Sequence, residues 1–430
     1  MAAVAMAHKP NYRPAFERFT KRRNEPDFLR QARQDSFARF ERLGIPNIHQ
    51  EAWRFTDLSG WAGTTFASAG PAPMDAAHLP PALDGPRLVF INGQINVALS
   101  RLAALPKGTV VTNLAAAIAS QPALIESHWE RVPGLGDHPF AALNSAFMVD
   151  GAFVYLAPGA ALEQPIQLVF HASGDGIAHY PRNLIVLGEA AQATIVEQYS
   201  GAGAYFACPL SEIALDDGTV LAHHKLQWED ARAQHLGGLR LVQKGNSNTA
   251  LHFLTAGGLL NRSDIVARLA GAGADCTLTG LTLVEDGQLG DYHVRVEHTE
   301  PHGRSRQTFK TVLDGKSRAV FDGLIHVAKD AQKTDAGQLN RNLLLTKRAA
   351  VHANPRLEIH ADDVKCSHGS TTGFLDPDAL FYLRSRGISQ ARARALLIHA
   401  FAKEQIETIR VAALREHLEE LLVSRFHPDD

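Results

Sequence analysis

The chain has 430 residues, of which 45% are hydrophobic and 20% are charged, an ordinary globular composition that excludes a disordered or collagen-like chain. Its 43 Lys and Arg residues and 45 Asp and Glu residues give a net charge of −2, so no overall basic field is available for nucleic acid. Three widely spaced cysteines provide neither a disulfide framework nor a zinc ribbon. The sequence shows neither a membrane-spanning apolar run nor a secretory signal. We therefore expect a soluble cytoplasmic protein without nucleic-acid or membrane partners.

The first expected element is an amphipathic helix between Pro26 and Leu43, in which apolar or small residues recur every three or four positions. It ends at Gly44 and Pro46, because Gly supplies a left-handed C-terminal conformation and Pro cannot continue the helix. The segment EAWRFTDL (residues 51–58) extends the helical zone, and an Ala- and Pro-rich stretch at about 62–86 is typical of a linker. Residues 1–86 are thus predicted to form an N-terminal helical region with a linker.

Residues 87–375 are predicted to form the core and to be mainly β. Short runs rich in Val, Ile, Leu and Thr, such as RLVFING, GAFVYLAPG and PIQLVFHAS, are bounded by glycine or charged turns. Turn-like glycines recur at irregular intervals that cluster near ~30 residues, which favours the stacked turns of a β-solenoid. A sandwich or barrel is the rival, because several runs also fit its shorter spacing. Periodicity alone does not decide between them.

The last zone, residues 376–430, is predicted to be helical. Asp376 is a good N-cap and Pro377 suits the first helical position, while Gly387 ends that helix and Ser389 can cap the next. Apolar residues then follow helical spacing: Ile398, Ala402, Ile406, Ile409 and Ala413 in one helix, and Leu414, Leu418, Leu421 and Leu422 in the next. These stripes must pack on the strand body, on each other or on another protein.

Two tempting signals have simpler explanations. The sequence DGKS (residues 314–317) ends like a phosphate-binding loop, but Lys310 stands where that loop needs glycine, so a tight turn at Asp314 and Gly315 is expected. Histidines number 21, and most are scattered along the chain. The five in strand-like or turn segments named below lack a helical pair or a carboxylate partner at a diagnostic interval. We expect surface or hydrogen-bonded core positions for His223, His224, His293, His298 and His302.

The segment RLEIHADDVKCSHGSTTG (residues 356–373) is the most informative. On an extended strand Cys366 and His368 point to the same face and could share a metal ion. His360 and Asp362 have the same parity, but the alternation of polar and apolar residues slips near Asp362, which we interpret as a bulge. Two ligands do not complete a soft-metal site. Either another chain supplies the remainder, or the pair is structural.

This segment, with the LFYLRSRGIS that follows, resembles the SufB/SufD family of iron-sulfur cluster assembly proteins. KCSHG together with LFYLRSRGI resembles the SufD branch in particular. EAWRFTDL, LVFINGQ, NRSDI (residues 261–265) and VEHTEPHGRSRQTFKTVL (residues 296–313) agree, in the same order along the chain. The resemblance therefore covers nearly the whole chain.

The resemblance implies a right-handed parallel β-helix flanked by N-terminal and C-terminal helical regions, which favours the solenoid over the sandwich. It also implies a scaffold subunit that is not an enzyme. Such a subunit pairs with SufB through the β-helix and with the separate ATPase SufC through the C-terminal helices. Cys366 and His368 map near the SufB interface, where a nascent iron-sulfur cluster is held. The implied cluster is transient, and no cofactor is expected to stay bound to the chain alone.

Three alternatives stay open at this point. The chain could be a purely structural adaptor that contributes no cluster ligand, or a β-helix carbohydrate-active enzyme, although no suitable set of acid and base residues is visible. The isolated chain could also pair with itself as a homodimer, because an exposed β-helix edge can self-associate. Cys208 and Cys276 match no family motif and are expected to be small hydrophobic core residues. No G-x-G-x-x-G fingerprint supports a flavin site.

Overall fold

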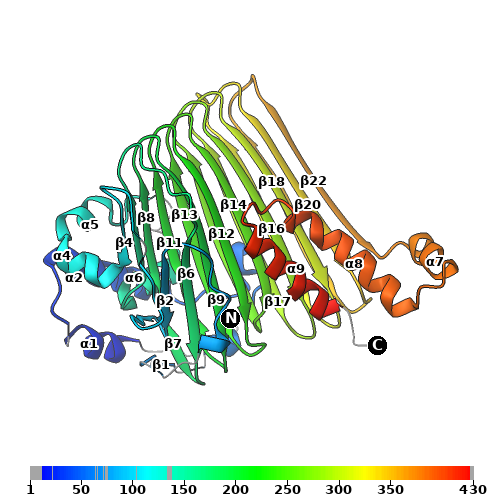
Figure 1. The fold of residues 1–430 in the computed structure, drawn as a ribbon, viewed down its shortest axis with the longest axis horizontal. Helices are drawn as coiled ribbons and strands as arrows, with labels where there is room; N and C mark the ends of the chain where they lie inside the picture. Colours follow the sequence, from blue (N-terminus) through cyan, green and yellow to red (C-terminus); the bar gives the residue numbers. More distant parts are fainter. Residues whose placement is uncertain are drawn as a thin grey trace, which may run out of the picture.

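Two long sheets, wound from one chain, form the body of the protein (Figure 1). The structure is a computed structural model that describes residues 12–21, 23–62, 64, 66–70, 72, 76–102, 104–132 and 138–426. From β8 to β22, the longer strands alternate between the two sheets, and each pairs in parallel with the corresponding strand one turn earlier and, except for the last strand of each sheet, with the one a turn later. The result is a parallel β-helix of about eight turns, as the resemblance implied.

Each sheet follows the axis of the β-helix. The first sheet contains β4 (Val110–Asn113), β5 (Ala152–Leu156), β8 (Arg182–Leu187), β11 (Leu210–Leu215), β13 (Gln234–Gln243), β15 (Leu260–Leu269), β17 (Leu289–His298), β19 (Arg318–Val327) and β21 (Ala350–Ile359), with β1 (Ala67–Ser68), β7 (Ile177–His179) and β10 (Phe206–Ala207) beside them. The second contains β3 (Gln94–Ile95), β2 (Arg87–Ile91), β6 (Ile166–Ser173), β9 (Gln192–Ala202), β12 (Val220–Glu229), β14 (Asn248–Gly257), β16 (Asp275–Val284), β18 (Arg304–Leu313), β20 (Asp335–Leu344) and β22 (Lys365–Phe374).

The register of the strands gives the length of one turn. Val220, Asn248, Asp275, Arg304, Asp335 and Lys365 lie in line across the second sheet, so one turn takes 27 to 31 residues. This confirms the period of about thirty residues that the glycine spacing suggested. Because every long-strand pairing is parallel and joins neighbouring turns, the sandwich alternative is wrong.

The interior of the β-helix is filled by alternate side chains from both sheets, as the pleat of a strand requires. Most are Leu, Ile, Val and Phe and have almost no exposed surface. Phe90, Phe170 and Tyr199 stack along the axis with ring centroids 4.7 and 5.0 Å apart. Burial of this apolar surface is the main stabilising contribution to such a core.

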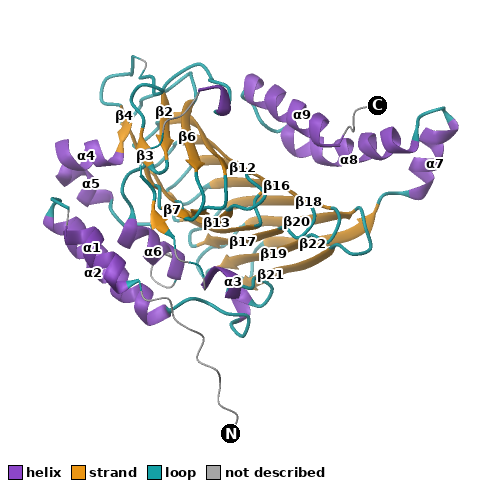
Figure 2. Cartoon of the chain, turned by 90° about the horizontal axis from the view of Figure 1, so that it is seen from below, coloured by secondary structure: helices purple, strands orange, loops and turns teal. Residues whose placement is uncertain are grey.

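Helices α1 (Arg13–Lys21), α2 (Asp27–Leu43), α4 (Leu114–Ser120), α5 (Pro122–His128) and α6 (Pro139–Phe147) gather at the N-terminal end of the β-helix (Figure 2). Helix α3 (Ser59–Ala62) and the 3-10 turn at Glu51–Trp53 lie beside the first sheet instead, and a second 3-10 turn spans Ala76–His78. The predicted helix is α2, and it ends as expected at Gly44, which has φ +69° and donates its backbone N–H to Phe40. Helical structure in EAWRFTDL is limited to the three-residue turn. The helices α4 to α6 lie inside the range predicted as β core and were not foreseen.

A buried arginine fixes the N-terminal segment to the first sheet. The guanidinium of Arg262 lies 3.6 Å from the Trp53 ring centre and donates a 2.7 Å hydrogen bond to the Ala52 carbonyl. It also pairs with Asp264 at 2.9 Å and Asp291 at 3.0 Å. The segments EAWRFTDL and NRSDI, 210 residues apart, therefore meet in one polar cluster.

Of the three C-terminal helices, α8 (Gln390–Ile406) and α9 (Ala412–Phe426) fold back along the outside of the second sheet, whereas α7 (Pro377–Ser385) lies beyond the end of β22 (Figures 1 and 2). The N-caps of α7 and α8 are Asp376 and Ser389, as predicted. The apolar stripes of α8 and α9 pack on each other and on the sheet, together with Leu226, Leu254 and Leu281. In contrast, α7 has no buried residue. No helix in the described part of the chain has the length and apolarity needed to cross a bilayer.

Candidate functional site

The last turn of the β-helix leaves both sheets with a free edge. Among the described residues, β21 pairs only with β19 and β22 pairs only with β20. Each is ten residues long, and no side chain of either strand is fully buried. Long unpaired edges of this kind are sites where another strand can add. The C-terminal end of the β-helix is therefore an open surface, whereas helices cover the other end.

Cys366 and His368 lie on β22, at this open end. In the strand register they stand opposite Ala336 and Gln338, both buried in the interior of the preceding turn. The two side chains thus lie on the same, interior-facing side of the last strand. Cys366 is half-buried against a small apolar cluster that includes Val327 and Ala336, and His368 is exposed.

The environment of Cys366 favours the protonated thiol. Partial burial raises the pKa of this thiol, the nearby Asp335 carboxylate raises it further, and a hydrogen bond with the backbone of Ala336 opposes both effects. A soft metal ion binds the thiolate, so it would have to displace the proton from Cys366.

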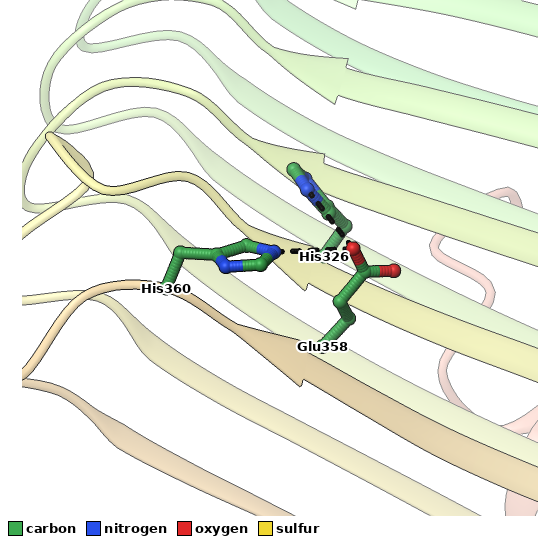
Figure 3. A group of neighbouring side chains, drawn as sticks. All are labelled: His326, Glu358 and His360. Carbon is green, nitrogen blue, oxygen red and sulfur yellow. Dashed lines mark hydrogen bonds and ion pairs between the residues drawn. The ribbon is translucent and has the colours of Figure 1, made fainter.

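His360 and Asp362 do not extend this pair. The segment from Arg356 to Gly373 is not one strand with a bulge, as we interpreted it, but the end of β21, a corner, and most of β22 in the other sheet. His360 follows β21 and hydrogen-bonds to Glu358 on the outside of the first sheet, as drawn in Figure 3. Asp362 lies in the corner and accepts a 2.8 Å hydrogen bond from Gln332.

Within the described residues, no third His, Cys, Asp or Glu joins Cys366 and His368 in a cluster of metal-ligand geometry. The chain by itself therefore brings together two candidate ligands of a soft-metal site and not four. Both lie on a strand whose outer edge is free, so further ligands would have to approach from outside the described part of the chain.

The predicted turn at Asp314 and Gly315 and the predicted core positions of Cys208 and Cys276 are confirmed. Asp314 and Gly315 form a turn between β18 and β19, and Gly315 has φ +58°. Cys208 and Cys276 are buried in apolar clusters, and burial raises the pKa of both thiols.

Sequence reasoning missed the carboxylate partners of several histidines. His223 is buried and hydrogen-bonds to Glu197 at 3.1 Å, one turn of the β-helix earlier, and His293 pairs with Asp291 at 3.1 Å. An interval of 26 residues is not a diagnostic spacing in a single element. The 26-residue interval between Glu197 and His223 can be recognised only when the period of the β-helix is used to search for neighbouring residues.

Comparison with known proteins identifies the family. A family model described as "SUF system FeS cluster assembly, SufBD core domain" matches residues 170–401, and one described as "SufBD protein N-terminal region" matches residues 6–168. The chain belongs to the SufBD family. A SufBD family protein of Synechocystis is 34% identical over 93% of this chain and 92% of its own length.

SufD proteins are among the relatives. The iron-sulfur cluster assembly protein SufD of Escherichia coli is 32% identical over 88% of both chains. SufD of Bacillus subtilis is 23% identical over 93% of this chain and 94% of its own. The predicted resemblance to the SufB/SufD family, and to SufD in particular, is confirmed.

Proposed function

We propose that this SufBD-family chain is the non-catalytic SufD-type subunit of a SufB–SufC–SufD scaffold for iron-sulfur cluster assembly. The observation that carries the proposal is the position of Cys366 and His368 on an unpaired edge strand at the open end of the β-helix. In this role the chain itself hydrolyses no ATP. The same open edges allow self-pairing as a homodimer when SufB is absent.

The incomplete ligand set supports a shared site. A thiol and an imidazole on one strand face provide two soft or borderline ligands, and a SufB-type partner docked on β21 and β22 would supply the rest. The cluster is then cargo held between two subunits. An adaptor role without cluster ligation is the second candidate, because Cys366 also contacts the apolar cluster around Ala336.

The C-terminal helices are the proposed dock for a SufC-type ATPase. On α7, Phe381 is 74% exposed and Tyr382 is 57% exposed, an unusual amount of aromatic surface for one helix. The chain runs directly from β22 into α7. Movement of docked ATPase subunits would therefore act on the strand that carries Cys366 and His368 through a short length of chain. A two-state interface biased by a ligand is a known route for such coupling.

The composition of the purified complex tests this proposal. Co-expression with SufB-type and SufC-type chains should give one SufB, one copy of this chain and two SufC subunits by native mass spectrometry. Truncation before Asp376 is a poor variant, because it would uncover the apolar face of the second sheet under α8 and α9. The double substitution Phe381→Ser and Tyr382→Ser changes only exposed side chains and should remove one SufC.

The matched control is Val97→Ser, because Val97 is 78% exposed and lies between β3 and β4. This variant should keep both SufC subunits. If the unchanged chain captures neither partner, the proposed scaffold role is wrong. If the α7 variant keeps both SufC subunits, α7 is not the dock.

A further inference from the structure

A second cluster of candidate metal ligands lies on the outer face of the first sheet, formed by His326, Glu358 and His360 (Figure 3). His326 on β19 and Glu358 on β21 are direct register partners on adjacent parallel strands. Glu358 and His360 are two residues apart, and their side chains meet on the same face of the sheet. The strand register thus sets the spacing of His326 and Glu358, and His360, directly after β21, is held by a 2.9 Å hydrogen bond from its backbone N–H to the Val327 carbonyl.

The distances fit one metal ion. Nε2 of His360 lies 3.1 Å from Oε1 of Glu358, and Nε2 of His326 lies 3.8 Å from the same oxygen. All three ligand atoms lie within 4.8 Å of one another. Ligands about 2.0 to 2.2 Å from a metal ion are separated by roughly 3 to 3.6 Å in octahedral or tetrahedral geometry. Small side-chain rotations would bring the three atoms to such distances.

The charges around the cluster leave its carboxylate available. One strand earlier on the same face, Glu297 pairs with Arg268 and Arg295, each at 2.6 Å. Among the described residues, the ion pairs of Glu358 are with His326 and His360. Nε2 is the His326 nitrogen that faces the cluster, 3.8 Å from Oε1 of Glu358. Nδ1 is buried and has no hydrogen-bond partner among the described residues.

We propose that His326, Glu358 and His360 form a binding site for a divalent first-row transition metal ion, and that its occupant in the cell is Fe²⁺. Two imidazoles and one carboxylate on one side of the ion leave open positions, as in sites that hold Fe²⁺ for further reaction. The side chains of Glu358 and His360 are both 52% exposed, so an incoming ligand can reach those positions. Metal binding stands independently of the proposed function, whereas the choice of Fe²⁺ rests on it.

The site lies near the candidate cluster ligands along the chain. His360 and Cys366 are six residues apart, so their Cα atoms are separated by about 20 Å at most. The cluster of His326, Glu358 and His360 offers nitrogen and oxygen ligands, while Cys366 and His368 offer a sulfur and a nitrogen. Fe²⁺ held by the first could therefore be passed to the second without leaving this end of the molecule.

The first experiment measures metal binding by the full-length chain. In a Cys366→Ser/His368→Ala background, which removes the thiolate, anaerobic titration with Co²⁺ should show one bound equivalent with visible bands of nitrogen and oxygen ligation. His326→Ala, His360→Ala and Glu358→Gln should each weaken binding at least ~10-fold, since even second-layer changes around metal sites cost that much. His49→Ala, at an exposed histidine outside the cluster, should change nothing. The site would be overturned if the background protein bound no Co²⁺, or if the three variants bound Co²⁺ as tightly as the background protein does.

The second experiment tests the occupant in the assembled complex with SufB-type and SufC-type chains. At limiting Fe²⁺, His360→Ala should slow cluster formation several-fold, and excess Fe²⁺ should restore the rate. An unchanged rate at limiting Fe²⁺ would overturn the assignment of Fe²⁺ while Co²⁺ binding still supports a metal site. Failure of the scaffold proposal is separate, because it appears as failure to assemble with the two partners.

Discussion

Glu197 shows how single residues shape the interior of this β-helix. Its carboxylate is fully buried and accepts hydrogen bonds from Tyr199 at 2.6 Å, Ser211 at 2.8 Å and His223 at 3.1 Å. Lys225, equally enclosed, is its register partner on β12. Burial alone would raise the pKa of Glu197, but the hydrogen bonds and the charges of His223 and Lys225 lower it to about 2. A buried charge is tolerated only with such partners.

The first prediction concerns this carboxylate. Glu197→Gln should lower the free energy of unfolding at pH 7 by about 3 kcal/mol, because it removes a counter-charge of the buried Lys225 ammonium. A carboxylate with a lowered pKa in the folded state stabilises above its unfolded pKa, and the contribution is lost as pH falls. The difference in melting temperature between the two proteins should therefore be largest above pH ~4.5 and shrink from there toward pH 2.

Glu189→Gln is the matched control, since Glu189 is exposed at a turn. It should change the melting temperature little at any pH. A constant difference for Glu197→Gln between pH 7 and pH 3 would mean that the charge of Glu197 does not contribute to stability.

At the scale of elements, the C-terminal helices depend on the second sheet for their position. Ile398, Ala402 and Ile406 of α8 are buried against it. The ammonium of Lys310, almost completely enclosed on β18, donates a 2.9 Å hydrogen bond to the Phe401 carbonyl and pairs with Glu404. The helices α8 and α9, which follow α7 in the chain, are thus fixed to the second sheet, whose last strand is β22.

The second prediction tests this attachment. Ile398→Ala should cost about 2 to 5 kcal/mol because it removes a buried side chain and leaves a cavity. Hydrogen exchange measured by mass spectrometry should become faster in residues 390–426. Leu396→Ala on the same helix, where the side chain is 38% exposed, should have a much smaller effect. Equal effects of the two substitutions would contradict the packing described for α8.

Elements with a one-sided apolar pattern could be predicted from the sequence, and those without one could not. The helix α2 shows helical periodicity and a clear stop at Gly44, and α8 has a buried stripe and an N-cap at Ser389. In α6 all nine residues are buried, so no contrast between two faces exists to reveal its period. The helices α4 and α5 are only seven residues long, too short for periodicity to distinguish them from strands.

At the scale of the whole molecule, the β-helix formed by the described residues has one end covered by helices and one open end. Each turn is stabilised by its neighbours, so a last turn without a covering element exposes its strand edges and part of its interior. Here that turn is β21 and β22, and Phe374 at the end of β22 is 58% exposed. We expect the open end to be covered in the assembled state.

The candidate site was predictable only in part. The alternation of side chains places Cys366 and His368 on one face, and this needs only the sequence and an extended strand. The place of His360 depends on the corner between β21 and β22, which sends neighbouring residues into different sheets. The meeting of His326 with Glu358 depends on the register across one full turn. Neither follows from local sequence spacing.

Cluster loading in the assembled complex tests the central claim most directly. We would purify the complex with SufB-type and SufC-type partners, containing either the unchanged chain or His368→Ala, and measure iron and acid-labile sulfide per complex after reconstitution. The account predicts an intact complex with cluster content lowered several-fold by His368→Ala, and little change with His302→Ala, since His302 is an exposed residue in the turn between β17 and β18. Full cluster loading by the His368→Ala complex would contradict the claim that this end of the β-helix contributes a cluster ligand.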